Sequence, residues 1–292
     1  MYRPEIDLDK LVAIDIHVHI ESGENGENSL PADLVAAAAK YFKKNEIDPD
    51  LESVAAHYRE RNMAAVVFTV DASTSLGHTP ISSKRIAEQA SDHADVLIPF
   101  GSVDPLKGQA AVDEAIDLVE NYGVRGFKLH PTVQGFDPSA ESVRPLWAAI
   151  DKLNVPVVIH TGQTGIGAGT PGGRGLKLGL SNPILLDEIY AEFPTLQIVM
   201  AHPSAPWVDE QISVATHKAN AWIDLSGWSP KYFPQQIVRA ANSYLQDKVL
   251  FGSDFPMITP DRWLSDFDAL EIKEDVRPKI LKENAIRLLE LS

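Results

Sequence analysis

Short apolar runs rich in β-branched residues alternate with amphipathic segments, and this alternation constrains the fold more than any other feature. Continuous apolar runs of this length are typical of strands buried on both faces, as in a parallel sheet. Eight such runs are Leu11–His17, Ala64–Val70, Val96–Val103, Val124–Leu129, Pro156–His160, Leu196–Ala201, Ala221–Leu225 and Lys248–Gly252. The amphipathic stretches between them predict helices, among them Ala110–Tyr122, Val143–Leu153, Pro183–Phe193 and Asp209–His217. This order indicates βα units joined by right-handed crossovers.

Eight βα units in 292 residues fit a closed (β/α)8 TIM barrel better than the rival fold, an open doubly wound sheet. We therefore predict a single α/β domain over residues 1–292. Residues 20–62 exceed a minimal barrel, and we interpret them as a lid-like insertion after the first strand. Residues 162–179 form a glycine-rich loop after the fifth strand. The ending, Lys273–Leu291, predicts a closing helix broken early by Pro278.

The composition narrows the classes of function. The formal net charge is −15, which disfavours non-specific binding to nucleic acid or to anionic lipid. The chain has no cysteine, so disulfides, thiolate metal sites and cysteine nucleophiles are excluded. No apolar run approaches the ~18 residues of a membrane span. The charged segment Met1–Lys10 lacks the apolar core of a signal peptide, so we expect a cytoplasmic protein.

Polar residues gather where the predicted strands end. In a (β/α)8 barrel, the loops at the carboxyl ends of the strands build the active site. Five of the nine histidines follow or end the first, fourth, fifth or sixth run: His17, His19, His130, His160 and His202. This concentration predicts a functional site at that rim.

A metal site is the first expectation from these residues. His17 and His19 stand two apart on a predicted strand, and side chains at i and i+2 point to the same face. His160 ends the fifth strand and Asp254 follows the eighth, so both are expected at the same rim. Imidazole suits Zn, Fe, Ni or Mn better than Mg or Ca. We predict that these four residues hold one divalent metal. The alternative for the histidines is that they pack in the barrel without binding a metal, and the alternative for Asp254 is a role in a turn or as a helix N-cap.

Catalytic roles are expected for residues beside that metal. Asp254 can also accept a proton from a water that the metal activates. His202, after the sixth strand, is interpreted as an acid/base residue, with a further ligand as the alternative. Lys128, at the end of the fourth strand, is interpreted as a charge stabiliser that contacts substrate, a carbamylated bridge between two metals, or a lysine paired with an acid. His130, two residues later, is a candidate substrate contact.

Taken together, the pattern of His-x-His on the first strand, histidines after the fifth and sixth, and an aspartate after the eighth resembles the amidohydrolase superfamily. The strings GFKLHP at 126–131, AHP at 201–203 and FGSDFP at 251–256 are similar to its amidohydrolase 2 branch. That branch includes aminocarboxymuconate-semialdehyde and resorcylate decarboxylases and several lactonases. The resemblance implies a one-metal site that does not require a carbamylated Lys128, in which the ligands are His17, His19, His160 and Asp254, with His202 as a catalytic residue beside them.

A narrower resemblance concerns three loops. The strings TGQTG at 161–165, LSGWSPKYFP at 225–234 and ITPDRW at 258–263 resemble bacterial 4-hydroxyphenyl-β-ketoacyl-CoA hydrolases. Those enzymes cleave an aromatic β-ketoacyl thioester to a hydroxybenzoate and acetyl-CoA. This resemblance implies an acyl-CoA as one candidate substrate.

Substrate contacts are also expected from the loops at the barrel mouth. Arg174, in the glycine-rich loop, is a candidate clamp for an anionic ligand; a mobile loop without that role is the alternative. Trp228 and Tyr232 follow the seventh strand and are candidate walls of a flat apolar slot for a ring. For each aromatic residue, ordinary barrel packing is the alternative.

These expectations favour a metal-dependent hydrolase that acts on a carbonyl or C–C bond by adding water to the carbonyl; for an aromatic β-ketoacyl-CoA, one candidate substrate, the cleavage would be a retro-Claisen reaction. Non-oxidative decarboxylation of an aromatic or enoic acid, and lactone hydrolysis, are the alternatives at the same site. A non-enzymatic binding barrel is the least favoured reading. The expected cofactor is one divalent metal, zinc or alternatively manganese, and the expected partners are a small-molecule substrate and a second copy of the chain.

Overall fold

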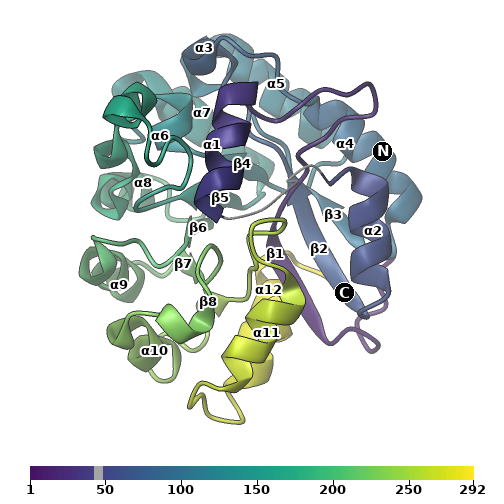
Figure 1. Ribbon diagram of the computed structural model, residues 1–292, viewed down its shortest axis with the longest axis vertical. Helices are drawn as coiled ribbons and strands as arrows, with labels where there is room; N and C mark the ends of the chain where they lie inside the picture. The colour runs from purple at the N-terminus through teal and green to yellow at the C-terminus, as the bar shows by residue number, and fades with distance from the viewer. Residues whose placement is uncertain (43–48) are drawn as a thin grey trace.

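Eight parallel strands alternate with helices from one end of the chain to the other (Figure 1). The computed structural model describes residues 1–42 and 49–292. The strands are β1 Ala13–His19, β2 Met63–Phe68, β3 Leu97–Pro99, β4 Phe127–Leu129, β5 Val157–His160, β6 Ile198–Ala201, β7 Ala221–Asp224 and β8 Val249–Leu250. Each overlaps one of the eight apolar runs, so all eight predicted strands are confirmed.

The strands pair in sequence order as two parallel sheets, β1-β2-β3 and β4-β5-β6-β7-β8. Isolated parallel bridges link the sheets at both seams, Gly101 with Phe127 and Val18 with Phe255. Backbone hydrogen bonds accompany them: Lys128 N donates to Gly101 O at 2.7 Å. At the other seam His19 N donates to Phe255 O at 2.8 Å. The eight strands thus follow one another around a barrel whose ladder is interrupted at these two seams.

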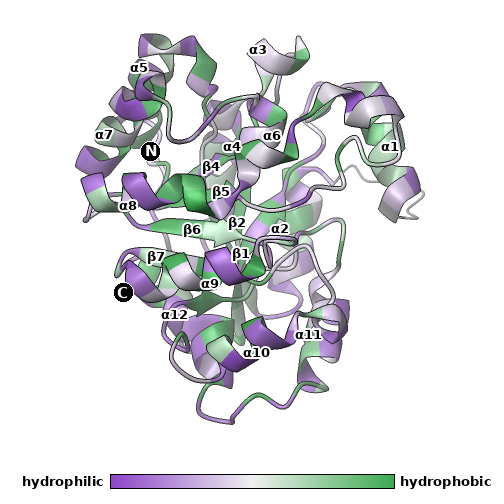
Figure 2. Cartoon of the chain, turned by 90° about the vertical axis from the view of Figure 1, so that its left-hand side faces the viewer, coloured by the Kyte–Doolittle hydropathy of each residue, from purple (hydrophilic) through white to green (hydrophobic). Residues whose placement is uncertain are grey.

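The helices cover the outside of this ring, as Figures 1 and 2 show. They are α1 Ala32–Phe42, α2 Leu51–Arg59, α3 Ser73–Leu76, α4 Ser83–Ala90, α5 Gln109–Glu120, α6 Pro131–Gln134, α7 Arg144–Leu153, α8 Asp187–Glu192, α9 Val208–His217, α10 Gln235–Ala241, α11 Pro260–Asp268 and α12 Asn284–Leu288. Side-chain caps fix several starts; for example, Asp50 accepts from Ser53 N ahead of α2, and Thr259 from Arg262 N ahead of α11. No helix in the described part of the chain is both long and apolar enough to cross a bilayer.

Two predicted helices differ from those observed. The stretch Pro183–Phe193 begins as a 3-10 turn, because Asn182 accepts from Ile184 N and tightens the entry. The predicted closing helix Lys273–Leu291 is reduced to a π turn at Lys279–Glu283 followed by α12. Arg277 and Pro278 are already helical ahead of the π turn, so the expected break at Pro278 is wrong: the proline lies in the first turn of the closing helix, where its missing N–H is tolerated.

Successive strand residues join two different cores. In β2, Ala64, Val66 and Phe68 belong to an inner cluster that is formed largely by alternate strand residues. Their neighbours Met63, Ala65 and Val67 belong to an outer cluster shared with the helices. Both faces of each strand are therefore buried, which explains why the runs are continuously apolar instead of alternating.

An irregularity in β1 sets the direction of the site residues. The register of β1 against β2 shifts between Asp15 and Val18. Before the shift, Ile14 and Ile16 join the inner cluster, whereas after it Val18 joins the outer one. His17 and His19 flank Val18 and therefore face the barrel interior. Such a bulge re-aims side chains near active sites.

The insertion after β1 supplies α1 and α2. In Figure 1, α1 crosses in front of β4 and β5, and Figure 2 places it at one end of the strands. Residues 43–48 of the predicted 20–62 insertion lie outside the described residues. That the insertion acts as a lid stays a prediction.

Candidate metal centre

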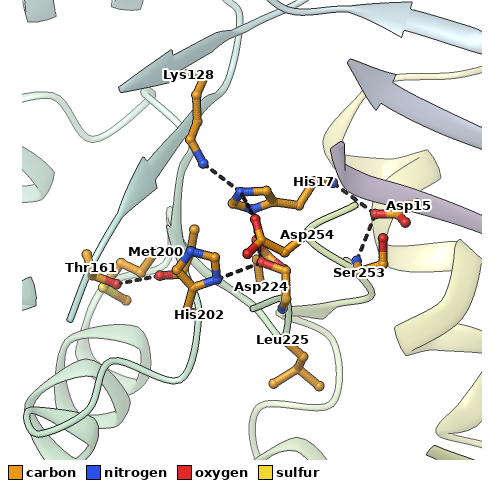
Figure 3. Close-up of polar contacts among 12 residues, drawn as sticks. Asp15, His17, Lys128, Thr161, Met200, His202, Asp224, Leu225, Ser253 and Asp254 are labelled. Atoms are coloured by element: carbon orange, nitrogen blue, oxygen red, sulfur yellow. Dashed lines mark hydrogen bonds and ion pairs between the residues drawn. The ribbon is translucent and has the colours of Figure 1, made fainter. Parts of the chain in front are cut away.

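Polar side chains from six strand ends converge at the mouth of the barrel, and Figure 3 shows five of them pointing toward a common centre. They are His17 and His19 of β1, Lys128 of β4, His160 of β5, His202 directly after β6, Asp224 at the end of β7 and Asp254 after β8. All except His19 are buried. The convergence brings together residues from position 17 to position 254.

His17, His19 and Asp254 form the tightest group. Nε2 of His17 lies 3.2 Å from Nε2 of His19 and 3.3 Å from Oδ1 of Asp254. Nε2 of His19 lies 3.4 Å from the same oxygen. Donors that surround one tetrahedral ion at 2.0–2.1 Å stand roughly 3.3 Å apart. The three atoms are therefore spaced as ligands of one ion.

His202 and His160 lie next to this group. One candidate ligand atom from each of His17, His202 and Asp254 lies within 4.8 Å of the others. The His160 ring centre is 4.9 Å from that of His202 and is stacked on His130 at 3.8 Å. Its Nε2 is buried and finds no hydrogen-bond partner in the described part of the chain. A buried orphan nitrogen is costly unless another partner binds it, and a metal is one such partner.

The electrostatic environment suits metal binding. Burial lowers the pKa of His17 and His160 well below the usual value, so both imidazoles stay neutral, the form that ligates. Burial opposes ionisation of Asp254, but a hydrogen bond from His19 and the nearby imidazoles outweigh it and lower its pKa. Burial also lowers the pKa of Lys128 to about 8. The donor set thus includes the neutral imidazoles of His17 and His160 and one ionised carboxylate.

Asp224 holds His17 from behind, and the sequence analysis assigned it no role. Its Oδ2 lies 2.6 Å from Nδ1 of His17, and both residues are fully buried. A carboxylate on the far nitrogen orients a ligating histidine and raises its basicity. The signal for finding it was present, because Asp224 is a polar residue at a strand end like the others. Asp224 is, however, enclosed by the apolar residues of the predicted run Ala221–Leu225, which hides it as a site residue.

Asp15 connects the two segments that carry the closest donors. Its Oδ1 accepts from the backbone N–H groups of His17 and Ser253, both at 3.0 Å. Its Oδ2 accepts from the Tyr58 hydroxyl of α2 at 2.6 Å. Burial raises the pKa of Asp15 to about 7. This carboxyl group ties the bulge of β1 to the loop that presents Asp254.

A cavity of about 1040 Å³, including its open mouth, lies over the cluster. Lys128, His130 and Trp228, three of the predicted substrate contacts, line it. The rest of the lining contains polar residues, among them Glu21 and Gln163, and a group of apolar residues that we call the aliphatic wall: Leu30, Val35, Ala38, Val70, Val133, Ile166 and Met257. Val35 and Ala38 belong to α1, so the insertion supplies one wall. The cavity therefore combines a polar floor with an apolar wall.

The other two predicted substrate contacts lie elsewhere. Arg174 is outside the lining, and its Nε donates to Asp33 Oδ2 at 2.6 Å on the surface. This ion pair ties the glycine-rich loop to the first turn of α1. Tyr232 is also outside the lining, with 64% of its surface exposed. Neither side chain faces the cavity in this structure.

The amidohydrolase family model matches residues 14–291 of the chain. The chain belongs to this family. The match includes every polar residue of the cluster described above, and it confirms the family resemblance drawn from the motifs. The amidohydrolase assignment by itself does not choose among the reactions considered above.

Comparisons with individual proteins agree with this family. The chain is 24% identical over 249 residues to a γ-resorcylate decarboxylase of a Rhizobium species, covering 70% of this chain and 74% of the relative. An uncharacterised TIM-barrel protein of Bordetella bronchiseptica has a TM-score of 0.76 at 24% identity, covering 95% and 98% of the two chains. A dihydroxybenzoic acid decarboxylase of a Polaromonas species, solved with manganese and 2-nitroresorcinol, has a TM-score of 0.67 at 16% identity, covering 96% and 97%. These likenesses confirm the predicted TIM-barrel fold.

Proposed function

We propose that this amidohydrolase is a metal-dependent, non-oxidative decarboxylase of a hydroxylated aromatic carboxylic acid. One observation carries the proposal: a cluster of imidazole and carboxylate donors forms the floor of a cavity that also has the aliphatic wall. The floor suits the oxygens of such an acid, and the wall suits its ring. Two of the three named relatives are decarboxylases of dihydroxybenzoic acids, and they favour this reaction over the hydrolysis that the motifs alone favoured.

The metal in this proposal is held by His17, His19, His160 and Asp254. The spacing of His17 and His19 around Asp254 Oδ1, together with the orphan Nε2 of His160, supports this ligand set. When bound, a divalent metal supplies Lewis acidity that holds and polarises carboxylate and phenolic oxygens. Both zinc and manganese accept such nitrogen and oxygen ligands, and the relative from Polaromonas contains manganese.

The residues of the chain then perform the proton transfer. His202 lies beside the cluster and lines the cavity, so it can deliver a proton to the ring carbon that bears the carboxylate. As that C–H bond forms, the bond from the ring carbon to the carboxylate breaks, and carbon dioxide leaves. Lys128, with Nζ 2.7 Å from His17 Nε2, places a positive group near the phenolic oxygens. The aliphatic wall excludes water from the ring.

The test is an assay with γ-resorcylate and a panel of hydroxybenzoates, in which products are identified by mass and carbon dioxide is measured. Chelation should abolish turnover, and manganese or zinc should restore it. His160→Ala should lower kcat/KM at least ~100-fold, because changes behind a ligand alone typically cost 10–100-fold. His217→Ala, at the exposed end of α9, is the matched control and should behave as the parent protein.

Two results would reject the proposal. One is turnover that survives complete removal of metal. The other is an enzyme that leaves every hydroxybenzoate intact but hydrolyses an aromatic β-ketoacyl-CoA or a lactone, which would restore the hydrolase interpretation. The acyl-CoA substrate and association between copies of the chain stay predictions.

A further inference from the structure

A buried chain of hydrogen bonds runs behind the metal cluster and ends on His202. Ser226, in the loop after β7, is fully buried and lies between Asp224 and His202. Its Oγ is 2.7 Å from Oδ2 of Asp224 and 2.9 Å from Nδ1 of His202. Its backbone N–H donates to Oδ1 of Asp224 at 2.7 Å. Figure 3 shows His202 and Asp224 on the same side of His17.

The positions of the protons in this network of hydrogen bonds follow from counting donors and acceptors. Lys128 Nζ can only donate, and it lies 2.7 Å from Nε2 of His17. Nε2 of His17 is therefore an acceptor, and the ring proton of neutral His17 is on Nδ1. That proton is donated to Asp224 Oδ2, the nearest acceptor at 2.6 Å.

The same count of donors and acceptors fixes the tautomer of His202. A serine hydroxyl has one proton, and an ionised Asp224 can only accept, so Ser226 donates to Asp224. Toward the two imidazoles at 2.9 Å, His17 Nδ1 and His202 Nδ1, the Ser226 oxygen can then only accept, which places the ring proton of neutral His202 on Nδ1. The remaining nitrogen, Nε2, is left with a free lone pair on a ring that lines the cavity.

A glycine keeps this contact short. A Cβ on Gly227 would lie 2.4 Å from Nδ1 and 2.8 Å from Cε1 of His202, and the φ of Gly227 is +74°. Any other residue there would push the imidazole away from Ser226 and would also be strained. The local backbone is therefore shaped around the Ser226–His202 contact.

We infer that Ser226 is a positioning residue, which together with Asp224 locks neutral His202 in the Nδ1–H tautomer and presents Nε2 to substrate. Its role in turnover rests on the proposed function, whereas the tautomer does not. With Nε2 free, His202 takes up a proton from solvent or from the substrate hydroxyl and passes that same proton to the ring carbon. Nδ1–H keeps its bond to Ser226 throughout, so the ring does not turn.

The decisive experiment is nitrogen-15 NMR of the histidine rings in the metal-free and the zinc-loaded protein, with the His202 signals assigned by comparison with His202→Gln. In the parent protein, Nδ1 of His202 should carry the proton and Nε2 should not. Ser226→Ala should release the lock and populate the Nε2–H tautomer, whereas Ser226→Thr keeps a hydroxyl and should restore the parent spectrum. Ser229→Ala is the control, because the Ser229 hydroxyl binds Asp266, away from His202.

Kinetics provide the second readout. Ser226→Ala should lower kcat about 10- to 100-fold with little change in KM, and Ser226→Thr should recover most of the loss. An Nε2–H tautomer in the parent protein, or a Ser226→Ala spectrum identical to the parent, would overturn the inference. Because the NMR result needs no substrate, it stands or fails independently of the decarboxylase assignment. If Ser226→Ala does not fold, Ser226→Cys, with a weaker donor, should show a partial loss of the lock.

Discussion

Replacing Asp224 by asparagine tests how the metal ligands are oriented. The two side chains have the same shape, but the amide offers one acceptor and one donor group in place of two acceptors. Ser226 N donates to Oδ1, so the amide oxygen is held at that position. The NH2 group then takes the place of Oδ2, facing Nδ1 of His17. Two donors cannot share this contact, and the proton of His17 must therefore move to Nε2, the nitrogen that would bind metal.

The size of the loss follows from this shift of the His17 proton to Nε2. A carboxylate that supports a ligating histidine typically contributes 10- to 100-fold in metal affinity, which is about 1.4–2.7 kcal/mol. If the amide turns over to restore the His17 contact, Ser226 N–H loses its acceptor instead. An unsatisfied buried donor costs about 1–3 kcal/mol. The first orientation thus predicts a loss of metal affinity, and the second predicts a loss of similar size in the free energy of unfolding.

The assay is competition between the protein and a chromophoric chelator for zinc or manganese at pH 7.5. Urea unfolding of the same samples separates a binding defect from loss of the folded state. Asp187→Asn is the matched control, since Asp187 pairs with Lys218 at the surface, 3.0 Å away. Asp224→Asn with both the metal affinity and the free energy of unfolding of the parent protein would refute the orientation argument, because neither His17 nor Ser226 would then need the carboxylate.

Two further substitutions test the surroundings of the site. Tyr58→Phe removes the hydroxyl that donates to buried Asp15 at 2.6 Å. The free energy of unfolding, measured in urea, should fall by about 1–3 kcal/mol. An unchanged value would show that this hydrogen bond does not stabilise the protein. Arg174→Ala removes an exposed ion pair with Asp33. The free energy of unfolding should change by less than about 1 kcal/mol, and the KM for a single-ring acid should stay the same. A large rise in KM would show that Arg174 contacts the substrate.

The sequence predicts the strands because burial on both faces leaves a continuous apolar run. It does not predict where the ladders end. The run Val96–Val103 forms a strand only over Leu97–Pro99. Pro99 has no N–H to donate, and beyond it the partner changes, since Gly101 bridges to Phe127 in the other sheet. Such breaks depend on neighbours that are distant in sequence.

The sequence predicts a site residue correctly where the position of that residue on its strand is enough to decide where its side chain points. Spacing places His17 and His19 on one face, but the shift in β1 register decides that this face is the interior. Asp224 is hidden inside a run that otherwise looks apolar. The pairing of Arg174 with Asp33, 141 residues away, is a tertiary contact that no local pattern contains. These are the points at which sequence reasoning stopped.

The aliphatic wall of the cavity has an evolutionary consequence. The donors of the floor come from strand ends, whereas Val35 and Ala38 of the wall come from one helix of the segment that follows β1. In the proposed enzyme, part of the wall therefore lies in a segment that supplies none of the residues proposed to move the proton. A relative can exchange or resize that segment and accept a different ring, while the groups that move the proton keep their places.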